Sequence, residues 1–192
     1  MRYPLFLILV LMAYSANSQT VVTKYDSTLK IGKAGYRISC FNKTVDRNIL
    51  NIRPVGFKQE AREVSFELKG RVTGAEIDDL NLDGFPDVLI YFLDPTLKPS
   101  ILSISSKNNE SFMPINFPDI TNDMVLSKGY RGGDEYKLVE GILFRKFPVY
   151  ETDTAIKTPT NKIRQIMYRV VEGDQGSLKF KVFKNFETTK NQ

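Results

Sequence analysis

An apolar run at residues 88–93 is the feature that most limits what this chain can fold into. Its sequence, VLIYFL, is short, rich in β-branched and aromatic residues, and followed by Asp94-Pro95. This length and punctuation favour a strand with two buried faces, because a helix with comparable burial would be longer. We therefore expect a central strand at residues 88–93, with other parts of the chain packed against both of its sides.

Many further segments have the pattern of short strands. Val64, Phe66 and Leu68, for example, alternate with polar residues, which is typical of a strand with one buried face. The predicted strands are residues 36–41, 48–57, 64–68, 72–77, 88–93, 100–105, 135–139, 142–149, 163–171 and 177–186. Each half-apolar sheet must cover its apolar face. The sequence therefore predicts an all-β protein, a single-domain antiparallel β-sandwich or partly closed barrel over residues 19–192.

Three segments have weaker patterns. Residues 19–29 form only a lead-in to the first clear strand. Residues 111–124 contain Pro114, Pro118 and several Asn and Asp residues, so we expect an irregular segment there. At most a short helix is expected near residues 122–127.

The first 18 residues have the pattern of a secretory signal peptide. A charged start, Met1-Arg2, precedes a short apolar core at residues 5–13, and small and polar residues follow up to Ser18. That core is shorter than the ~20 residues that span a bilayer, although an uncleaved anchor is the alternative. We expect residues 1–18 to be removed and the mature protein to be periplasmic or secreted, with no membrane attachment.

The side chains that most enzymes use are scarce. The chain has no histidine, and Cys40 is its single cysteine, which removes the Ser-His-Asp and Cys-His arrangements and most zinc sites. We therefore expect a binding protein and not an enzyme. A hydrolase that uses carboxylates alone is the weaker alternative.

The basic residues are spread along the sequence and do not form a continuous cluster. The formal net charge is +5, and the lysines at 179, 181 and 184 stand next to Leu178, Phe180 and Val182. This alternation is typical of the solvated face of a strand, so we expect no nucleic-acid binding. Attraction to anionic cell-wall or surface polymers stays open.

An acidic loop precedes the central strand and has the spacing of a calcium site. The oxygens at its odd positions come from Asp79, Asn81, Asp83, the carbonyl of Phe85, and Asp87. Calcium takes six to eight oxygen ligands. Gly84 allows a tight turn, and in a tight turn the oxygens at odd positions can converge on one ion. The twelfth position, where a helix-loop-helix site has glutamate, falls inside the predicted strand. We therefore predict a strand-flanked calcium site with a structural role; the alternative is a plain turn.

Two further stretches carry a family resemblance. They are the Gly-Tyr-Arg-Gly-Gly-Asp-Glu-Tyr segment at residues 129–136 and the Val-Glu-Gly-Ile-Leu-Phe-Arg-Lys-Phe-Pro-Val-Tyr segment at residues 139–150. Together with the acidic loop, in this order, they resemble the periplasmic inhibitors of invertebrate-type (i-type) lysozyme, over about residues 70–180. The resemblance implies a secreted antiparallel β-sandwich, often a homodimer, whose partner is a lysozyme and whose protruding loop blocks the lysozyme cleft.

The inhibitory loop of that family departs from the pattern in this chain. The family carries a Ser-Gly-x-x-Tyr type of motif after the strand that follows the acidic loop, whereas residues 93–100 here read LDPTLKPS, without the Gly or the Tyr. We expect a different polar plug that can pair with carboxylates in a lysozyme cleft. The predicted partner-binding residues are Asp94, Thr96, Lys98, Ser100, Tyr130 and Arg131.

Alternatives exist for these residues and for the function. The alternative for the 94–100 segment is a solvated loop between two strands, and the alternative for Tyr130 is packing in the core and hairpin. Asp134 and Arg145 are expected to pair across the hairpin. The alternative function is a calcium-stabilised extracellular β module that binds another protein or a glycan.

Overall fold

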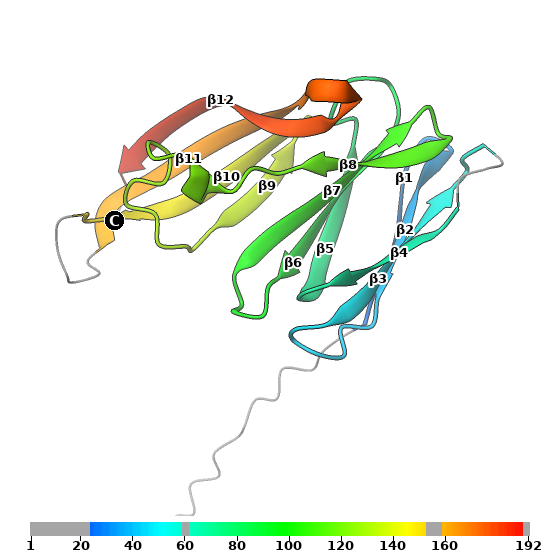
Figure 1. Cartoon of the computed structure of the whole chain (residues 1–192), viewed down its shortest axis with the longest axis horizontal. Helices are drawn as coiled ribbons and strands as arrows, with labels where there is room; N and C mark the ends of the chain where they lie inside the picture. Colours follow the sequence, from blue (N-terminus) through cyan, green and yellow to red (C-terminus); the bar gives the residue numbers. More distant parts are fainter. Residues whose placement is uncertain (1–23, 59–61, 153–158, 190–192) are drawn as a thin grey trace, which may run out of the picture.

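A computed structural model describes residues 24–58, 62–152 and 159–189. These residues form twelve strands, and the expected all-β fold is confirmed (Figure 1). The strands are β1 (Tyr25–Ile31), β2 (Ala34–Cys40), β3 (Asn48–Val55), β4 (Val64–Leu68), β5 (Arg71–Asp78), β6 (Asp87–Leu93), β7 (Pro99–Lys107), β8 (Ser111–Asn116), β9 (Glu135–Val139), β10 (Ile142–Tyr150), β11 (Pro159–Glu172) and β12 (Leu178–Thr189). Two single 3₁₀ turns are η1 (Ile120–Asn122) and η2 (Asp174–Gly176).

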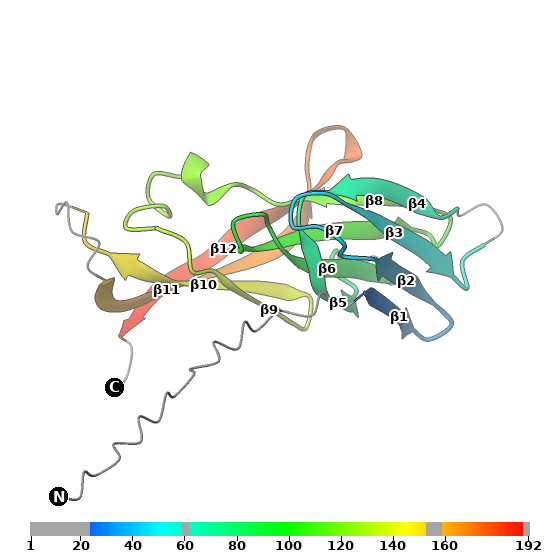
Figure 2. The same cartoon turned by 90° about the horizontal axis from the view of Figure 1, so that it is seen from below.

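The strands form two sheets. The first has the order β1-β2-β3-β4, and the second has the order β5-β6-β7-β8-β12-β11-β10-β9. Neighbouring strands are antiparallel except at the β8–β12 seam, where Leu178 pairs with Ile115 and Lys179 with Asn116 in parallel. Because only these two residue pairs join its halves, the second sheet bends sharply at the seam, and the β9–β12 half lies beside the β5–β8 half (Figures 1 and 2).

The β5–β8 half lies between two hydrophobic clusters. Val88 and Ile90 of β6 point toward the first sheet and join a cluster that includes Tyr36. Leu89 points the other way and joins a cluster that includes Phe147, from the β9–β12 half. The central strand is therefore buried on both faces over its first part, as predicted from its unbroken apolar sequence. Its last residues, 91–93, are half-buried.

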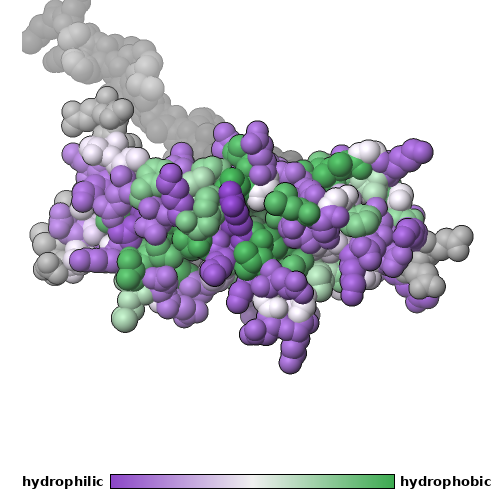
Figure 3. All heavy atoms as spheres, turned by 90° about the horizontal axis from the view of Figure 1, so that it is seen from above, coloured by the Kyte–Doolittle hydropathy of each residue, from purple (hydrophilic) through white to green (hydrophobic). Residues whose placement is uncertain are grey.

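A long connection between β8 and β9, residues 117–134, closes the second cluster on the concave side of the bent sheet (Figure 1). Ile120 and Leu126 of this connection are buried in that cluster. Seen from above, apolar side chains lie in the middle of the molecular surface and hydrophilic side chains surround them (Figure 3).

Two predictions for the weaker segments were wrong, and a third was limited to a single turn. Residues 25–31 form a full strand, β1, which pairs with β2 along its whole length. Residues 111–116 form β8 despite Pro114, because β8 meets β12 only beyond that proline, so its missing N–H interrupts no pairing with β12. The short helix allowed near residues 122–127 is limited to η1, which ends at Asn122; beyond it, the Asp123 side chain accepts hydrogen bonds from the backbone N–H groups of Val125 and Leu126, which holds turns there.

The expected signal peptide, residues 1–18, lies outside the described residues. Among the residues that are described, no helix has the length and hydropathy needed to cross a bilayer.

A buried hydrogen bond links the first sheet to the loop before β6, and its loss is measurable. The Tyr36 hydroxyl of β2 donates to the buried carbonyl oxygen of Pro86, at 2.8 Å, in the loop before β6. We expect Tyr36→Phe to lower the free energy of unfolding by about 1–2 kcal/mol, because a buried carbonyl loses its donor. Urea unfolding followed by circular dichroism measures this. The matched control is Tyr25→Phe, in the half-buried tyrosine of β1; an equal effect of both substitutions would contradict the prediction.

Candidate functional site

The turn between β6 and β7 is organised by one carboxylate. Asp94 Oδ1 accepts hydrogen bonds from the backbone N–H of Thr96 (2.7 Å), the Thr96 hydroxyl (2.7 Å) and the backbone N–H of Lys98 (2.9 Å). The backbone N–H of Asp94 also donates to the Lys98 carbonyl, and that of Leu97 to the Asp94 carbonyl. Burial alone would raise the pKa of Asp94, but the hydrogen bonds from Lys98 and Thr96 outweigh it and lower that pKa. The turn is therefore fixed by its own side chain.

The turn displays two side chains that are free to meet a partner. Leu97 has a positive φ of 62° and is 65% exposed, and Lys98 is also exposed. Among the described residues, Lys98 forms no ion pair. Ser100 lies inside β7, half-buried and opposite Phe92 of β6. Of the residues predicted here, Asp94 and Thr96 therefore shape the turn, whereas Lys98 is presented by it. Sequence reasoning missed Leu97, whose signal was a lone apolar residue within a polar loop.

The second predicted segment leads into β9. Arg131 is exposed, but Tyr130 is half-buried and its ring packs edge-on against Phe147, with 4.8 Å between ring centroids. The Tyr130 hydroxyl donates to the Asp134 carboxylate, and burial together with Asp134 raises the pKa of Tyr130 to about 12. This geometry supports the packing interpretation of Tyr130. A role of Tyr130 or Arg131 in partner binding stays a prediction.

The expected pair of Asp134 and Arg145 is present, and it is buried. The Arg145 Nε donates to Asp134 Oδ1 at 2.6 Å, and the two side chains are only 5% and 4% exposed. A second guanidinium nitrogen donates to the Tyr130 hydroxyl at 3.0 Å. Burial opposes the charge on Arg145, but the Asp134 hydrogen bond and the electrostatic attraction of Asp134, Tyr136 and Tyr168 together outweigh it and raise the pKa of Arg145. The pair therefore belongs to the core, where losing one partner would leave an uncompensated charge.

Aromatic rings surround the same guanidinium. The ring centroids of Tyr130, Tyr136, Phe147 and Phe117 lie 5.1, 5.6, 5.7 and 5.8 Å from the Arg145 Cζ. Cation–π attraction at such distances adds to the ion pair in this buried site. The family-like motifs at residues 129–136 and 139–150 thus contribute to one buried polar centre.

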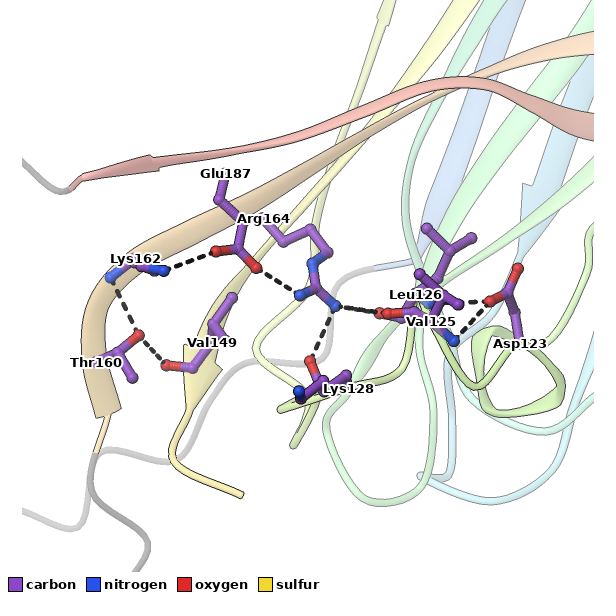
Figure 4. Close-up of polar contacts among 9 residues, drawn as sticks. All are labelled: Asp123, Val125, Leu126, Lys128, Val149, Thr160, Lys162, Arg164 and Glu187. Carbon is purple, nitrogen blue, oxygen red and sulfur yellow. Dashed lines mark hydrogen bonds and ion pairs between the residues drawn. The ribbon is translucent and has the colours of Figure 1, made fainter. Parts of the chain in front are cut away.

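A second buried arginine, which sequence reasoning missed, holds the connection before β9. Arg164 of β11 donates through Nη1 to the carbonyl oxygens of Leu126 (2.7 Å) and Lys128 (2.9 Å), while its Nη2 bonds to Glu187 of β12 (Figure 4). Such an arginine is recognisable in sequence only if its strand face is known, because it replaces an apolar residue on the inward face. The result is a rigid turn at residues 123–128, whose tip exposes Met124 and Val125 by 89% and 76%.

The acidic loop is closed by its own backbone. Asp79 accepts hydrogen bonds from the backbone N–H groups of Asp83 (3.0 Å) and Gly84 (2.8 Å). Asp83 accepts one from the N–H of Phe85 (2.9 Å) and another from the Asn81 amide (2.9 Å). Among the described residues, no group of three or more His, Cys, Asp or Glu side chains is arranged to hold a metal ion. The engaged oxygens of Asp79, Asn81 and Asp83 each keep a second lone pair, so these residues are chemically compatible with a cation.

Asp87 differs from the other predicted ligands because it is fully buried. Its carboxylate accepts hydrogen bonds from the backbone N–H groups of Leu80 (2.9 Å), Asn81 (3.3 Å) and Ser106 (3.0 Å), and so ties the loop to β7. Asp78, just before the loop, accepts one from the N–H of Gly141, in the turn between β9 and β10, at 2.7 Å. The structure thus gives Asp87 a direct use as a hydrogen-bond acceptor; calcium binding stays a prediction.

An apolar groove of about 580 Å³ opens between β4 and β8. Its lining is mainly apolar, with Phe66 of β4, Ile104 of β7 and Phe112 of β8, and it includes Arg62 and Glu110. None of the predicted site residues lines this groove.

Asp87 predicts a particular pH dependence of stability. Burial raises the pKa of Asp87 from 3.8 to about 6, against the opposing hydrogen bonds of Ser105, Ser106 and Leu80. A raised carboxyl pKa means that the folded state holds the proton more tightly, so the contribution of Asp87 to stability falls as the pH rises from about 4 to about 6. Its total change is on the order of 3 kcal/mol.

Asp87→Asn isolates this contribution, since asparagine does not titrate. We expect the variant to be destabilised at every pH, and by more at pH 4 than at pH 7, in urea unfolding. The control is Asp119→Ala: the hydrogen bonds of Thr121 lower the pKa of Asp119, so the effect of that substitution shrinks as the pH falls. A destabilisation by Asp87→Asn that is larger at pH 7 than at pH 4 would contradict the prediction.

Comparison of the sequence with models of known protein families and with curated proteins finds no match.

Proposed function

We propose that this chain is an exported binding protein that inhibits a lysozyme, with the β6–β7 turn inserted into the active-site cleft of the enzyme. The observation that carries the proposal is the preorganised turn. Three hydrogen bonds to Asp94, two of them from backbone N–H groups, hold the turn, and Leu97 and Lys98 are exposed at its tip. A loop that is already rigid loses little conformational entropy on binding.

The chemistry of the tip fits a glycosidase cleft. Such clefts place a pair of carboxyl groups around the scissile bond. The Lys98 ammonium is exposed, and an ammonium held near carboxylates forms a charge-assisted hydrogen bond. Leu97 beside it supplies apolar contact. In this proposal the chain forms a stoichiometric complex with the lysozyme and catalyses no reaction itself.

The scaffold behind the turn supports the same proposal. β6, which carries the turn, is buried on both faces in its first half, and the family-like segments build the Asp134–Arg145 centre in the adjacent layer. A stiff scaffold keeps the tip in place when the enzyme presses against it. A homodimer, expected from the family resemblance, stays a prediction.

Inhibition is measured as the rate at which lysozyme clears a bacterial suspension. We expect the mature protein to slow an i-type lysozyme, and Lys98→Ala to weaken inhibition roughly tenfold, which corresponds to one lost charged contact of about 1.4 kcal/mol. Leu97→Ala should weaken it as well. The matched control is Lys30→Ala, an exposed lysine of β1, which should inhibit like the original chain. No effect of the protein on i-, c- or g-type lysozymes in molar excess would overturn the proposal.

A second candidate is a cation-stabilised extracellular β module that binds another protein or a glycan. One observation favours it: the acidic loop connects to β2 through Tyr36, to β7 through Asp87 and to the β9–β10 turn through Asp78. A calcium ion held by Asp79, Asn81, Asp83 and the Phe85 carbonyl would therefore stabilise all three layers at once.

Calcium binding is tested by the melting temperature. Calcium at about 100 times its Kd would stabilise the fold by about 2.7 kcal/mol, a rise of several degrees that a chelator reverses. Asp79→Asn with Asp83→Asn should abolish the rise, and sodium chloride of equal ionic strength is the control for screening. A melting temperature that is the same in calcium and in chelator would remove the cation from the function.

A further inference from the structure

The outer face of the β9–β12 half carries much of the positive charge of the chain. This is the face that points away from the hydrophobic cluster of Leu143, Phe147 and Ile166. Its cationic side chains are all exposed: Lys137, Lys146, Arg169, Lys179, Lys181 and Lys184. Glu135 is the one carboxylate at an outward position of these described strands. The face therefore holds a charge excess comparable with the formal net charge of the whole chain, +5.

Most of this charge is not neutralised within the protein, although Glu135 lies opposite Lys146 in the strand register. None of the six takes part in an ion pair with a described residue, whereas Lys162 and Arg164, on the inward side of β11, both pair with Glu187. No described segment lies over the outer face, since the first sheet covers the β5–β8 half and the residue 117–134 connection covers the concave side (Figures 1 and 2). An uncompensated group of like charges raises the free energy of the protein and attracts a polyanion.

Apolar and aromatic side chains lie between the charges in registered rows. One row across the four strands reads Lys137, Phe144, Met167 and Lys184. The strands lie ~4.8 Å apart, so the two lysines are separated by about 14 Å. Phe183, 42% exposed, stands at a bulge of β12 with the Arg169 guanidinium 4.3 Å from its ring centroid. Flat rings between cations offer stacking surface for the C–H face of a sugar as well as charge for its acidic groups.

We infer that this outer face binds an extended acidic glycan, a polysaccharide with carboxylate or sulfate groups; the choice of a glycan rests on the export that we propose above. A second copy of this chain is disfavoured because it would bring like charges together. A membrane surface is disfavoured because Val139 and Phe183 are the exposed large apolar side chains on this face, while Phe144 and Met167 are half-buried, which leaves little apolar area for insertion. Charge complementarity and the two rings of Phe144 and Phe183 among the cations together fit a linear acidic chain.

The test is a calorimetric titration of the mature chain with two probes, a polygalacturonate fragment for carboxylates and a heparin fragment for sulfates. Binding of either probe, with an affinity that falls as salt rises, is expected, and the tighter probe identifies the acidic group. Absence of binding to both at low salt would overturn the inference. So would tighter binding of single-stranded DNA or of anionic phospholipid vesicles than of either glycan.

Matched variants locate the binding face. Lys137→Glu with Lys184→Glu should weaken glycan binding roughly tenfold and lower the salt dependence. Lys30→Glu with Lys33→Glu makes the same change of net charge at β1 and its turn, where both lysines are exposed, and should change affinity by no more than about twofold. Equal losses in the two pairs would overturn the inference. Phe183→Ala should weaken binding while leaving the salt dependence unchanged, because it removes stacking and no charge.

The same variants separate this inference from the proposed function. The Lys137→Glu, Lys184→Glu pair should inhibit lysozyme like the original chain, and Lys98→Ala should bind the glycan like the original chain. Glycan binding without lysozyme inhibition would reject only the proposed inhibition of lysozyme. Lysozyme inhibition without glycan binding would reject only the proposed glycan-binding role of the outer face.

Discussion

The buried carboxylate of Asp87 is the interaction on which the arrangement of layers depends. It stands where β6 begins and accepts hydrogen bonds from backbone N–H groups of the preceding loop and of β7. The carbonyl of the neighbouring Pro86 accepts from Tyr36 of the first sheet, and Asp78 accepts from Gly141 of the β9–β10 turn. One short loop therefore joins three layers whose strands are otherwise connected mainly by apolar packing. A buried anion surrounded by backbone donors has few alternative positions, so it specifies one arrangement where apolar contacts alone would allow several.

The features of the fold that follow from local pattern were predictable, and those that follow from tertiary contacts were not. The apolar run at residues 88–93 indicated burial on both faces, and the alternation of Val64, Phe66 and Leu68 indicated a half-buried strand. The strand β1 escaped notice because its inward positions include a serine, Ser27, and its pairing with β2 supplies the order that its composition lacks. The sharp bend at the parallel β8–β12 seam has no local signature at all, since it arises where two distant segments meet.

For the candidate site too, local pattern predicted some features, and others depended on tertiary contacts. Asp94, Thr96 and Lys98 could be selected because a polar loop after a buried strand must be exposed. Their separate roles could not, since they depend on which oxygen accepts which N–H. The Asp134–Arg145 pair was expected from sequence, but its burial among aromatic rings makes it part of the core. Arg164 was missed because a lone arginine in an alternating strand looks like a surface residue until the inward face of β11 is known.

Because few backbone hydrogen bonds join the two halves of the second sheet at the seam, contacts near the acidic loop also help to position these halves. The β6–β7 turn belongs to the β5–β8 half, whereas the basic outer face belongs to the β9–β12 half, and only two residue pairs join these halves through the sheet. Their relative position therefore depends on side chains: Leu89 in the shared cluster, and Asp78 on the Gly141 N–H. Asp78, just before the acidic loop, thus also helps to fix the geometry between the two proposed binding surfaces. The two proposals together place two binding surfaces on one chain, and this junction holds those surfaces in one orientation without enlarging the sheet.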